Sequence, residues 1–282
     1  MKLILAIYLT TFLIKIFAYL SSNVTAIFAD ALHSVVDIML LLLLATASKV
    51  SEIKADKLHP MGHGLVKNVA SLAISVAFIT ILAFELLKEG LNKIINPIKN
   101  YPNLEIALIA EFSVLALLLL GTVVYKRKKG VISRTIMFES LNDSLSTIAA
   151  ILGILAISWG YPLSDGIATI IIALLIVFNS IRLFLENAKL LIGMSPPEEF
   201  YRKIENFCLE KGIKGVHDMV AIYLDEGTIH LDMHVTVDGE MSVKKADELI
   251  EGLAEELKDK FPNIKHISIH LCPHGGNRRK IY

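Results

Sequence analysis

The stretch ADALHSVVDIM, residues 29–39, places three ionisable side chains in a segment that otherwise has the composition of a membrane span. His33 and Asp37 are four residues apart, which on a helix puts them above one another on one face. Asp30 lies three residues before His33 on the same stripe. An ionisable side chain within a span is costly unless it faces a partner or a cavity, so this pair is a candidate cation site.

A second pair with the same spacing lies further along the chain, in MFESLNDSLSTI. Glu139 and Asp143 are also four residues apart. Two facing helices that each offer such a pair supply four ligands, the number that a tetrahedral divalent cation requires. A polar group at a helix end or membrane interface is the alternative for any one of these residues. Two matched pairs favour a cation site formed by both.

The elements that must position these pairs are predicted from composition. The chain is 54% hydrophobic and only 20% charged, and its mean hydropathy is +0.58, values typical of membrane proteins. Apolar runs long enough to cross a hydrocarbon core of about 30 Å cover residues 3–20, 26–47, 69–87, 104–125, 136–159 and 163–186. Residues 1–194 are therefore predicted to form a domain of six transmembrane helices. A signal peptide is disfavoured, because Lys15 interrupts the first run and five more spans follow.

The orientation is predicted from basic residues in the connections between spans. Lysines and arginines flank the second and fourth connections, whereas the first and fifth, SSN and WGYPLSD, contain none. Both termini are therefore expected in the cytoplasm, with the protein in the cell membrane. The third connection, which also carries lysines, fits this pattern least.

Residues 195–282 are rich in charge and are predicted to form a separate soluble domain, at whose boundary Pro196 and Pro197 end one helix and start another. A helix from about residue 197, strands near 216–224 and 228–237, a helix near 243–260 and a strand near 266–271 give the order α-β-β-α-β. This order predicts a small α+β sheet with both helices on one face. The net charge of zero gives no argument for nucleic-acid binding.

At these motifs the chain resembles the cation diffusion facilitator family of divalent metal transporters, over nearly its whole length. FADALHSVVD resembles the family's second-span motif, which implies that the transport site is formed by His33, Asp37, Glu139 and Asp143. DKLHPMGHG resembles its D-x-x-H-P-x-G-H-G signature, which implies a second metal site near the cytoplasmic surface, formed by Asp56, His59 and His63. A carboxylate and two imidazoles also suit a metal by their own chemistry, and Pro60 and Gly62 indicate a loop.

The resemblance further implies a metal-chaperone-like cytoplasmic domain that dimerises and binds metal. Its candidate ligands by resemblance are His217, His234, Asp247, His270 and Cys272. Strand alternation places His230, Asp232 and His234 on one face. A solvated face accounts for His230 and Asp232, whereas the histidines on three separate strands favour a metal.

The two cysteines of the chain, Cys208 and Cys272, suit a reducing compartment and argue against a disulfide framework. Cys208 lies among apolar residues of a predicted helix, so a buried structural thiol is expected there. His274, in the C-terminal tail, is expected at the surface.

The sequence therefore predicts a divalent cation efflux transporter, not an enzyme, whose expected partners are divalent cations, protons, membrane lipid and a second copy of the chain. Zinc is the first choice of ion. Glu139 stands where zinc-transporting members commonly have His, so a manganese or iron exporter is an alternative, and Asn142 could replace Glu139 as a ligand. Leu65 stands where relatives with a charge pair between protomers have Lys.

Proton exchange is expected because ligands bind metal only when deprotonated, so metal and proton exclude one another. A membrane metal sensor that binds cations without moving them is the competing hypothesis. A metalloenzyme built on the loop site is disfavoured, because the sequence shows no separate nucleophile or general base at a recognisable spacing.

Overall fold

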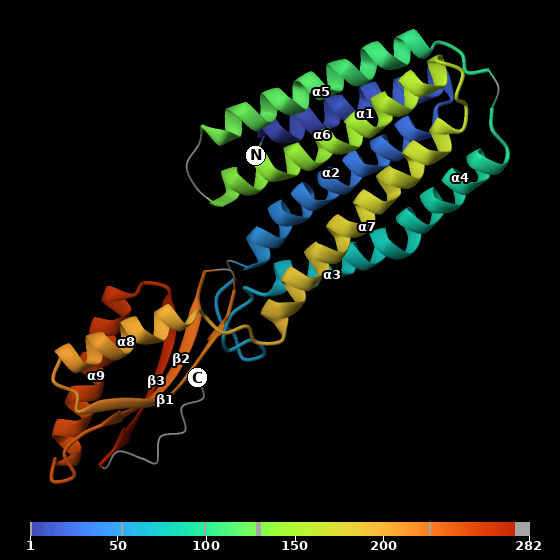
Figure 1. The fold of residues 1–282 in the computed structure, drawn as a ribbon. Helices are drawn as coiled ribbons and strands as arrows, with labels where there is room; N and C mark the ends of the chain where they lie inside the picture. Colours follow the sequence, from blue (N-terminus) through green and yellow to red (C-terminus); the bar gives the residue numbers. More distant parts are fainter. Residues whose placement is uncertain (1, 52, 99, 128–130, 226, 274–282) are drawn as a thin grey trace. The chain divides into compact units, whose positions relative to one another are not determined.

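A computed structural model describes residues 2–51, 53–98, 100–127, 131–225 and 227–273 (Figure 1). Within its helices, the side chains of residues 2, 44, 48, 131–136, 138 and 139 lie outside that description. The chain divides into two compact units. The first comprises Met1–Lys49 and Ala70–Leu185, and the second Val50–Val69 and Glu186–Tyr282. The predicted domain boundary after residue 194 stays a prediction.

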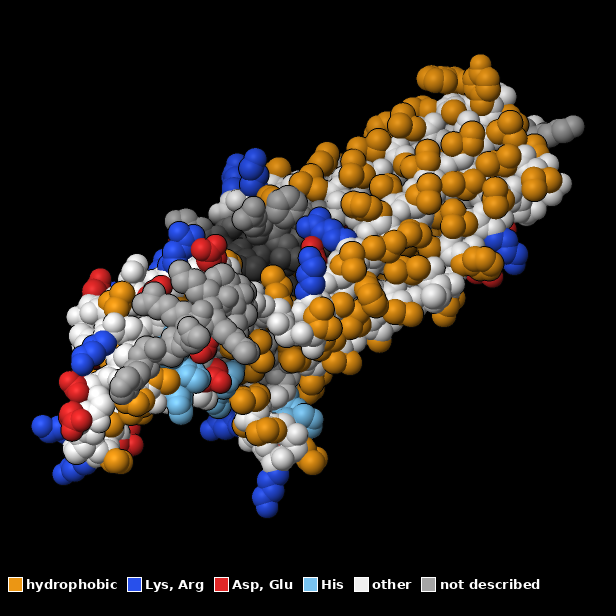
Figure 2. Space-filling model, turned by 60° about the horizontal axis from the view of Figure 1, so that its bottom comes forward, with side chains coloured by type: hydrophobic (Ala, Val, Ile, Leu, Met, Phe, Trp, Pro, Cys, Tyr) orange, Lys and Arg blue, Asp and Glu red, His pale blue; other side chains and the backbone are white. Residues whose placement is uncertain are grey.

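In the described part of the chain, six helical segments are long and apolar enough to cross a membrane, which confirms the predicted architecture. They are α1 (Lys2–Ser22), α2 (Thr25–Ser51), α3 (Val66–Ala77) continued by η1 (Phe78–Ala83) and α4 (Phe84–Ile95), α5 (Leu104–Lys126), α6 (Val131–Ser158) and α7 (Ser164–Leu191). Hydrophobic side chains cover most of the face of these helices that Figure 2 shows. Such a surface is expected of helices that lie in lipid, because the hydrocarbon core of the bilayer that they cross is apolar.

The third span changes its helix type midway. The segment η1 is π-helical and separates α3 from α4. No Pro or Gly occurs between Val66 and Glu89 from which a change of helix type could be predicted. A single π-helical segment inside an α-helix alters the direction in which the following side chains point.

Asn23 and Asp165 fix the position at which α2 begins. Asn23 has a φ of 56° and its N–H donates to the carbonyl of Tyr19 at 2.7 Å, which ends α1. The carboxylate of Asp165, at the start of α7, accepts from the N–H groups of Thr25 at 3.1 Å and Ala26 at 2.8 Å. Because N–H groups in a first turn have no partner within their own helix, α2 is capped by another span.

Small residues allow the spans to pack closely. The core of the first unit includes the fully buried alanines Ala18, Ala26, Ala29, Ala107 and Ala150. A Cβ atom added at Gly166 would lie only 2.6 Å from the carbonyl oxygen of Gly90. The backbones of α7 and α4 therefore touch at this crossing, which only glycine permits.

The C-terminal residues form the predicted α-β-β-α-β order. The elements are α8 (Glu198–Glu210), β1 (Gly215–Tyr223), β2 (Ile229–Thr236), α9 (Val243–Lys260) and β3 (Ile264–Cys272). The sheet has the order β1-β2-β3, with β2 antiparallel to β1 and parallel to β3. Both helices cover one face of it, where Leu231 and Met233 of β2 meet Ile204 of α8 and Leu257 of α9. Alternate residues of β2 therefore point to the opposite face, as predicted.

Cys208 lies in this core and is fully buried, as expected. Burial, with a smaller contribution from the nearby Glu205 carboxylate, raises the pKa of its thiol to about 11. The thiol therefore stays protonated and acts as a small apolar side chain.

A β-bulge interrupts the pairing of β1 with β2. His217 pairs with His234 and Val220 with Asp232, so β1 advances three residues where β2 advances two. Asp218, inside the bulge, has a φ of 49°. As a result His217 faces the same side of the sheet as Val220, although strict alternation would place them on opposite sides.

Candidate metal centres

The first candidate centre lies between α2 and α6. His33, Asp37 and Asp143 each offer a ligand atom, and these atoms all lie within 4.8 Å of one another. The three side chains are at most 4% exposed. Neither carboxylate oxygen of Asp143 has a hydrogen-bond partner among the described groups. A buried carboxylate without donors is unfavourable unless a cation or a proton occupies the space in front of it.

Ser146 orients the imidazole of this centre. Its hydroxyl is hydrogen-bonded to Nδ1 of His33, which leaves Nε2 as the nitrogen available to a cation. A fixed partner on one ring nitrogen sets the tautomer and ring orientation of a metal-binding histidine. Ser146 was not among the residues predicted from the sequence. Its position three residues after Asp143, on the same face of a helix, is the signal that could have found it.

The fourth predicted ligand of this centre is Glu139. Its backbone belongs to α6, but its side chain lies outside the described residues. Asn142, the alternative, is half-buried on the same helix. The choice between these two residues stays a prediction.

The second candidate centre is the loop before α3. Ligand atoms of Asp56, His59 and His63 lie within 4.8 Å of one another. Asp56 also holds the turn, because its Oδ1 accepts from the N–H groups of Leu58 at 2.8 Å and His59 at 2.6 Å. The hydrogen bond from the backbone of His59 is the main reason that the pKa of Asp56 lies below its ordinary value. The carboxylate therefore stays ionised and available to a cation.

The glycines of this loop permit a close approach to the C-terminal sheet within the second unit. A Cβ atom at Gly64 would lie 2.7 Å from Cβ of Asp225 and 2.9 Å from the carbonyl oxygen of Leu224. Gly62 has a φ of 89°, a conformation that side-chain-bearing residues rarely adopt. The GHG motif is therefore needed for the path of the backbone as well as for the ligand between its glycines.

The third candidate centre lies on the open face of the three-stranded sheet. Ligand atoms of His217, His234 and Cys272, one from each strand, lie within 4.8 Å of one another. Nδ1 of His234 is 3.5 Å from Sγ of Cys272. His270 is a neighbour of this group, with its ring centroid 4.6 Å from that of His234. The bulge in β1 is what turns His217 toward the other two residues.

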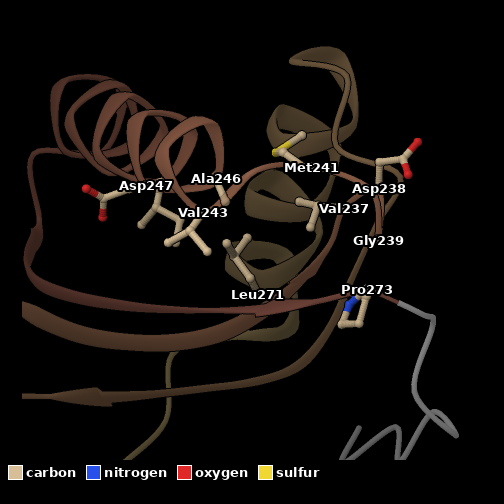
Figure 3. Close-up of a pocket in the computed structure, with 10 residues that line it drawn as sticks. Val237, Asp238, Gly239, Met241, Val243, Ala246, Asp247, Leu271 and Pro273 are labelled. Atoms are coloured by element: carbon tan, nitrogen blue, oxygen red, sulfur yellow. The ribbon is translucent and has the colours of Figure 1, made fainter.

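The structure does not bring Asp247 to this centre. Asp247 is exposed on α9, and α9 packs on the opposite face of the sheet from the histidines. Figure 3 shows it beside a pocket of about 350 Å³ whose other lining residues include Val237, Met241, Ala246 and Leu271. The pocket lining contains no histidine or cysteine among the described residues. His274, which was expected at the surface, lies outside the residues that the structure describes.

Apolar spans around a buried set of nitrogen and carboxylate groups that could hold a metal ion indicate a membrane protein that binds divalent cations. The family model of the cation efflux transmembrane domain matches residues 1–192, and that of the cation efflux cytoplasmic domain matches residues 196–274. The chain therefore belongs to the cation efflux family, the cation diffusion facilitators. Members of this family are divalent cation transporters and not enzymes.

Curated relatives match along nearly their whole length. An uncharacterized transporter of Methanocaldococcus jannaschii is 28% identical over 265 residues, which cover 92% of each chain. The cation-efflux pump FieF of Pectobacterium atrosepticum is 27% identical over 273 residues, 95% of this chain and 90% of the relative. The manganese efflux system protein MneP of Bacillus subtilis is 23% identical over 270 residues, 92% of this chain and 90% of the relative.

Proposed function

We propose that this chain exports zinc from the cytosol in exchange for protons, and that His33, Asp37 and Asp143 form the transport site. The convergence of these three buried side chains from two spans is the observation that carries the proposal. One imidazole and two carboxylates are ligands that zinc accepts, and a fourth position is left for Glu139, Asn142 or water.

The choice of zinc is supported by the ligands on the C-terminal sheet. A thiolate from Cys272 with imidazoles from His217 and His234 is a soft set, which favours zinc over manganese. This set would bind the ion on the cytoplasmic side, in a domain that pairs with a second copy of the chain. The loop centre, with two imidazoles and one carboxylate, also suits zinc.

Proton exchange is supported by the surroundings of the transport site. Its ligands must be deprotonated to bind a cation, and the carboxylates lie where the dielectric constant is low. When the ion leaves, ionised carboxylates at such a depth are unfavourable, so protons take its place. Alternate opening of one site to both sides of the membrane then couples the two flows.

The test is uptake into sealed proteoliposomes loaded with a pH-sensitive dye. Zinc added outside should enter while protons leave, and Asp143→Asn should abolish both flows. Zinc binding without flux would support the sensor hypothesis, and zinc entry without proton movement would exclude the exchange.

A manganese exporter is the second candidate function. MneP, a relative over nearly the whole chain, is named as a manganese efflux protein, and Glu139 would add an oxygen ligand that manganese favours. Competition between zinc and manganese in the same vesicles distinguishes the two proposals.

A further inference from the structure

A second group of ionisable side chains is buried in the membrane-spanning unit, apart from the predicted transport ligands. Lys15 of α1, Asp30 of α2 and Glu111 of α5 are each 0% exposed. Three charges at this depth are costly, so each needs a partner.

Lys15 and Asp30 form a buried ion pair that also uses most of their hydrogen-bonding capacity. The Lys15 ammonium lies 3.0 Å from Oδ2 of Asp30 and donates to Oγ of Ser34 at 2.8 Å and to the carbonyl oxygen of Asp30 at 3.3 Å. Its three donors are thus all used. Oδ2 of Asp30 also accepts from the hydroxyl of Thr147 at 2.9 Å.

Glu111 meets no hydrogen-bond donor of this kind in the part of the chain that the structure describes. Among the described residues, neither oxygen of its carboxyl group meets a donor, and neither does Oδ1 of Asp30. The two carboxyl groups lie within hydrogen-bonding reach of one another. Two ionised carboxylates cannot form a hydrogen bond with one another, because both are acceptors without a donor hydrogen. A proton on Glu111 changes this, since its O–H can then donate to Oδ1 of Asp30.

We propose that Glu111 is a proton-binding site of the transporter, which holds one proton against Asp30 and releases it when a divalent cation occupies the neighbouring transport site. This inference rests on the proposed proton exchange and extends it to a residue that does not touch the metal. With that proton the group is neutral overall, consisting of one ammonium, one carboxylate and one carboxylic acid.

The link to the transport site is electrostatic. Asp30 accepts from Thr147 of α6, and His33 is hydrogen-bonded to the adjacent Ser146, so the two groups lie beside one another between α2 and α6. At this separation the charge of Asp143 acts on Lys15 and Asp30. Lys15 and Asp30 are in turn the charged groups that act on Glu111. A divalent cation at Asp143 and His33 offsets the negative charge there and favours the ionised form of Glu111. The O–H bond then breaks, the proton leaves to water, and Lys15 keeps its charge throughout.

The test uses Glu111→Gln in the full-length protein reconstituted in lipid. Its amide can still donate to Oδ1 of Asp30, so the packing is kept while the exchangeable proton is lost. Glu105→Gln is the matched control, because Glu105 is an exposed carboxylate in the first turn of the same helix. Titration calorimetry with zinc, in buffers of different ionisation enthalpy, counts the protons released per ion bound.

Glu111→Gln should release about one proton fewer per bound zinc than the wild type, with a correspondingly shallower dependence of affinity on pH. Glu105→Gln should match the wild type in both. Equal proton release by all three proteins would overturn the proposal.

Infrared difference spectra provide a second measurement. Zinc should abolish a protonated-carboxyl band of the wild type that is already missing from Glu111→Gln and still present in Glu105→Gln, and its persistence in the wild type would contradict the proposal. If the wild type exchanges no protons at all, the proposed function fails. If exchange is intact but indifferent to Glu111→Gln, only this inference fails.

Discussion

The ammonium of Lys15 lies 3.0 Å from Oδ2 of Asp30, and both side chains are completely buried between the first two spans. Removal of one member of a buried ion pair leaves an uncompensated charge and typically costs about 3–5 kcal/mol. Lys15→Met should therefore destabilise the protein strongly, whereas Lys15→Met combined with Asp30→Asn should recover part of the loss. Thermal aggregation midpoints in detergent would show the order. A double variant no more stable than the single one would mean that the charges are not the source of the cost.

Ser146 should contribute to metal affinity without being a ligand. Ser146→Ala removes the hydrogen bond to His33 and should weaken zinc binding at the transport site by about 10–100-fold, the usual cost of losing such an orienting partner. Ser144→Ala is the control, since Ser144 is also buried but its hydroxyl donates, among the described groups, to the carbonyl of Ser140 in its own helix. Equal affinities of the two variants would argue that the bond has no orienting role.

The loop centre should lose its ion when its charge is removed and keep its turn. In Asp56→Asn the amide oxygen can still accept from the N–H groups of Leu58 and His59, so the backbone should persist while bound zinc falls by about one ion per protomer. Elemental analysis counts the ions. An unchanged count would show that the loop histidines serve only the turn.

The same carboxylate gives the loop a defined response to acid. Because the folded-state pKa of Asp56 is below its unfolded value of 3.8, its stabilising effect is complete above that pH and is lost as the pH falls through the lower folded value. The amide resonances of Leu58 and His59 should report this titration below pH 3.8.

The C-terminal domain should be stabilised by zinc through the open face of its sheet. If residues 195–282 fold alone, zinc at about a hundredfold its dissociation constant adds about 2.7 kcal/mol, or roughly 10–20 °C in melting temperature. Cys272→Ala should remove most of this increase and Asp247→Ala, on the helical face, should not. Scanning calorimetry with and without zinc measures the increase in melting temperature for each variant. A larger loss in Asp247→Ala than in Cys272→Ala would mean that Asp247, and not Cys272, is the ligand.

Ion choice should respond to residue 139. Glu139→His would replace an oxygen ligand by a nitrogen, which should raise the zinc-to-manganese transport ratio and alter its pH dependence. Paired assays of both ions in the same vesicles measure the ratio. Unchanged values would indicate that Glu139 does not contact the ion and would favour Asn142 or water.

The spans and the order of the C-terminal elements could be predicted because each rests on a local pattern. Long apolar runs and alternating strand residues are visible in a single stretch of sequence. The spacing of His33 with Asp37, and that of Asp56 with His59 and His63, are visible in the same way. What could not be predicted depends on contacts between distant segments. The cap on α2 comes from Asp165, and the partner of His33 comes from α6.

Glu111 is a different case, since its signal was available. A carboxyl group in the middle of the apolar run 104–125 is unusual in itself. The carboxyl group that it faces, however, is Asp30 of α2, and no periodicity in the chain reveals which residues of two separate spans meet. Asp247 failed to join the other ligands for a related reason: the face of a sheet that a helix covers is a property of the assembled domain.

The bulge at Asp218 has a consequence for any comparison of ligands between relatives. Side chains along a β-strand point alternately to the two sides of the sheet, and one extra residue exchanges the sides for all residues that precede it in the strand. A relative without that residue needs its histidine one position nearer to Val220 to reach the same side of the sheet. A gap-free alignment of the two strands would then set a ligand of one protein against a core residue of the other, and a conserved metal centre would look as if it had been lost.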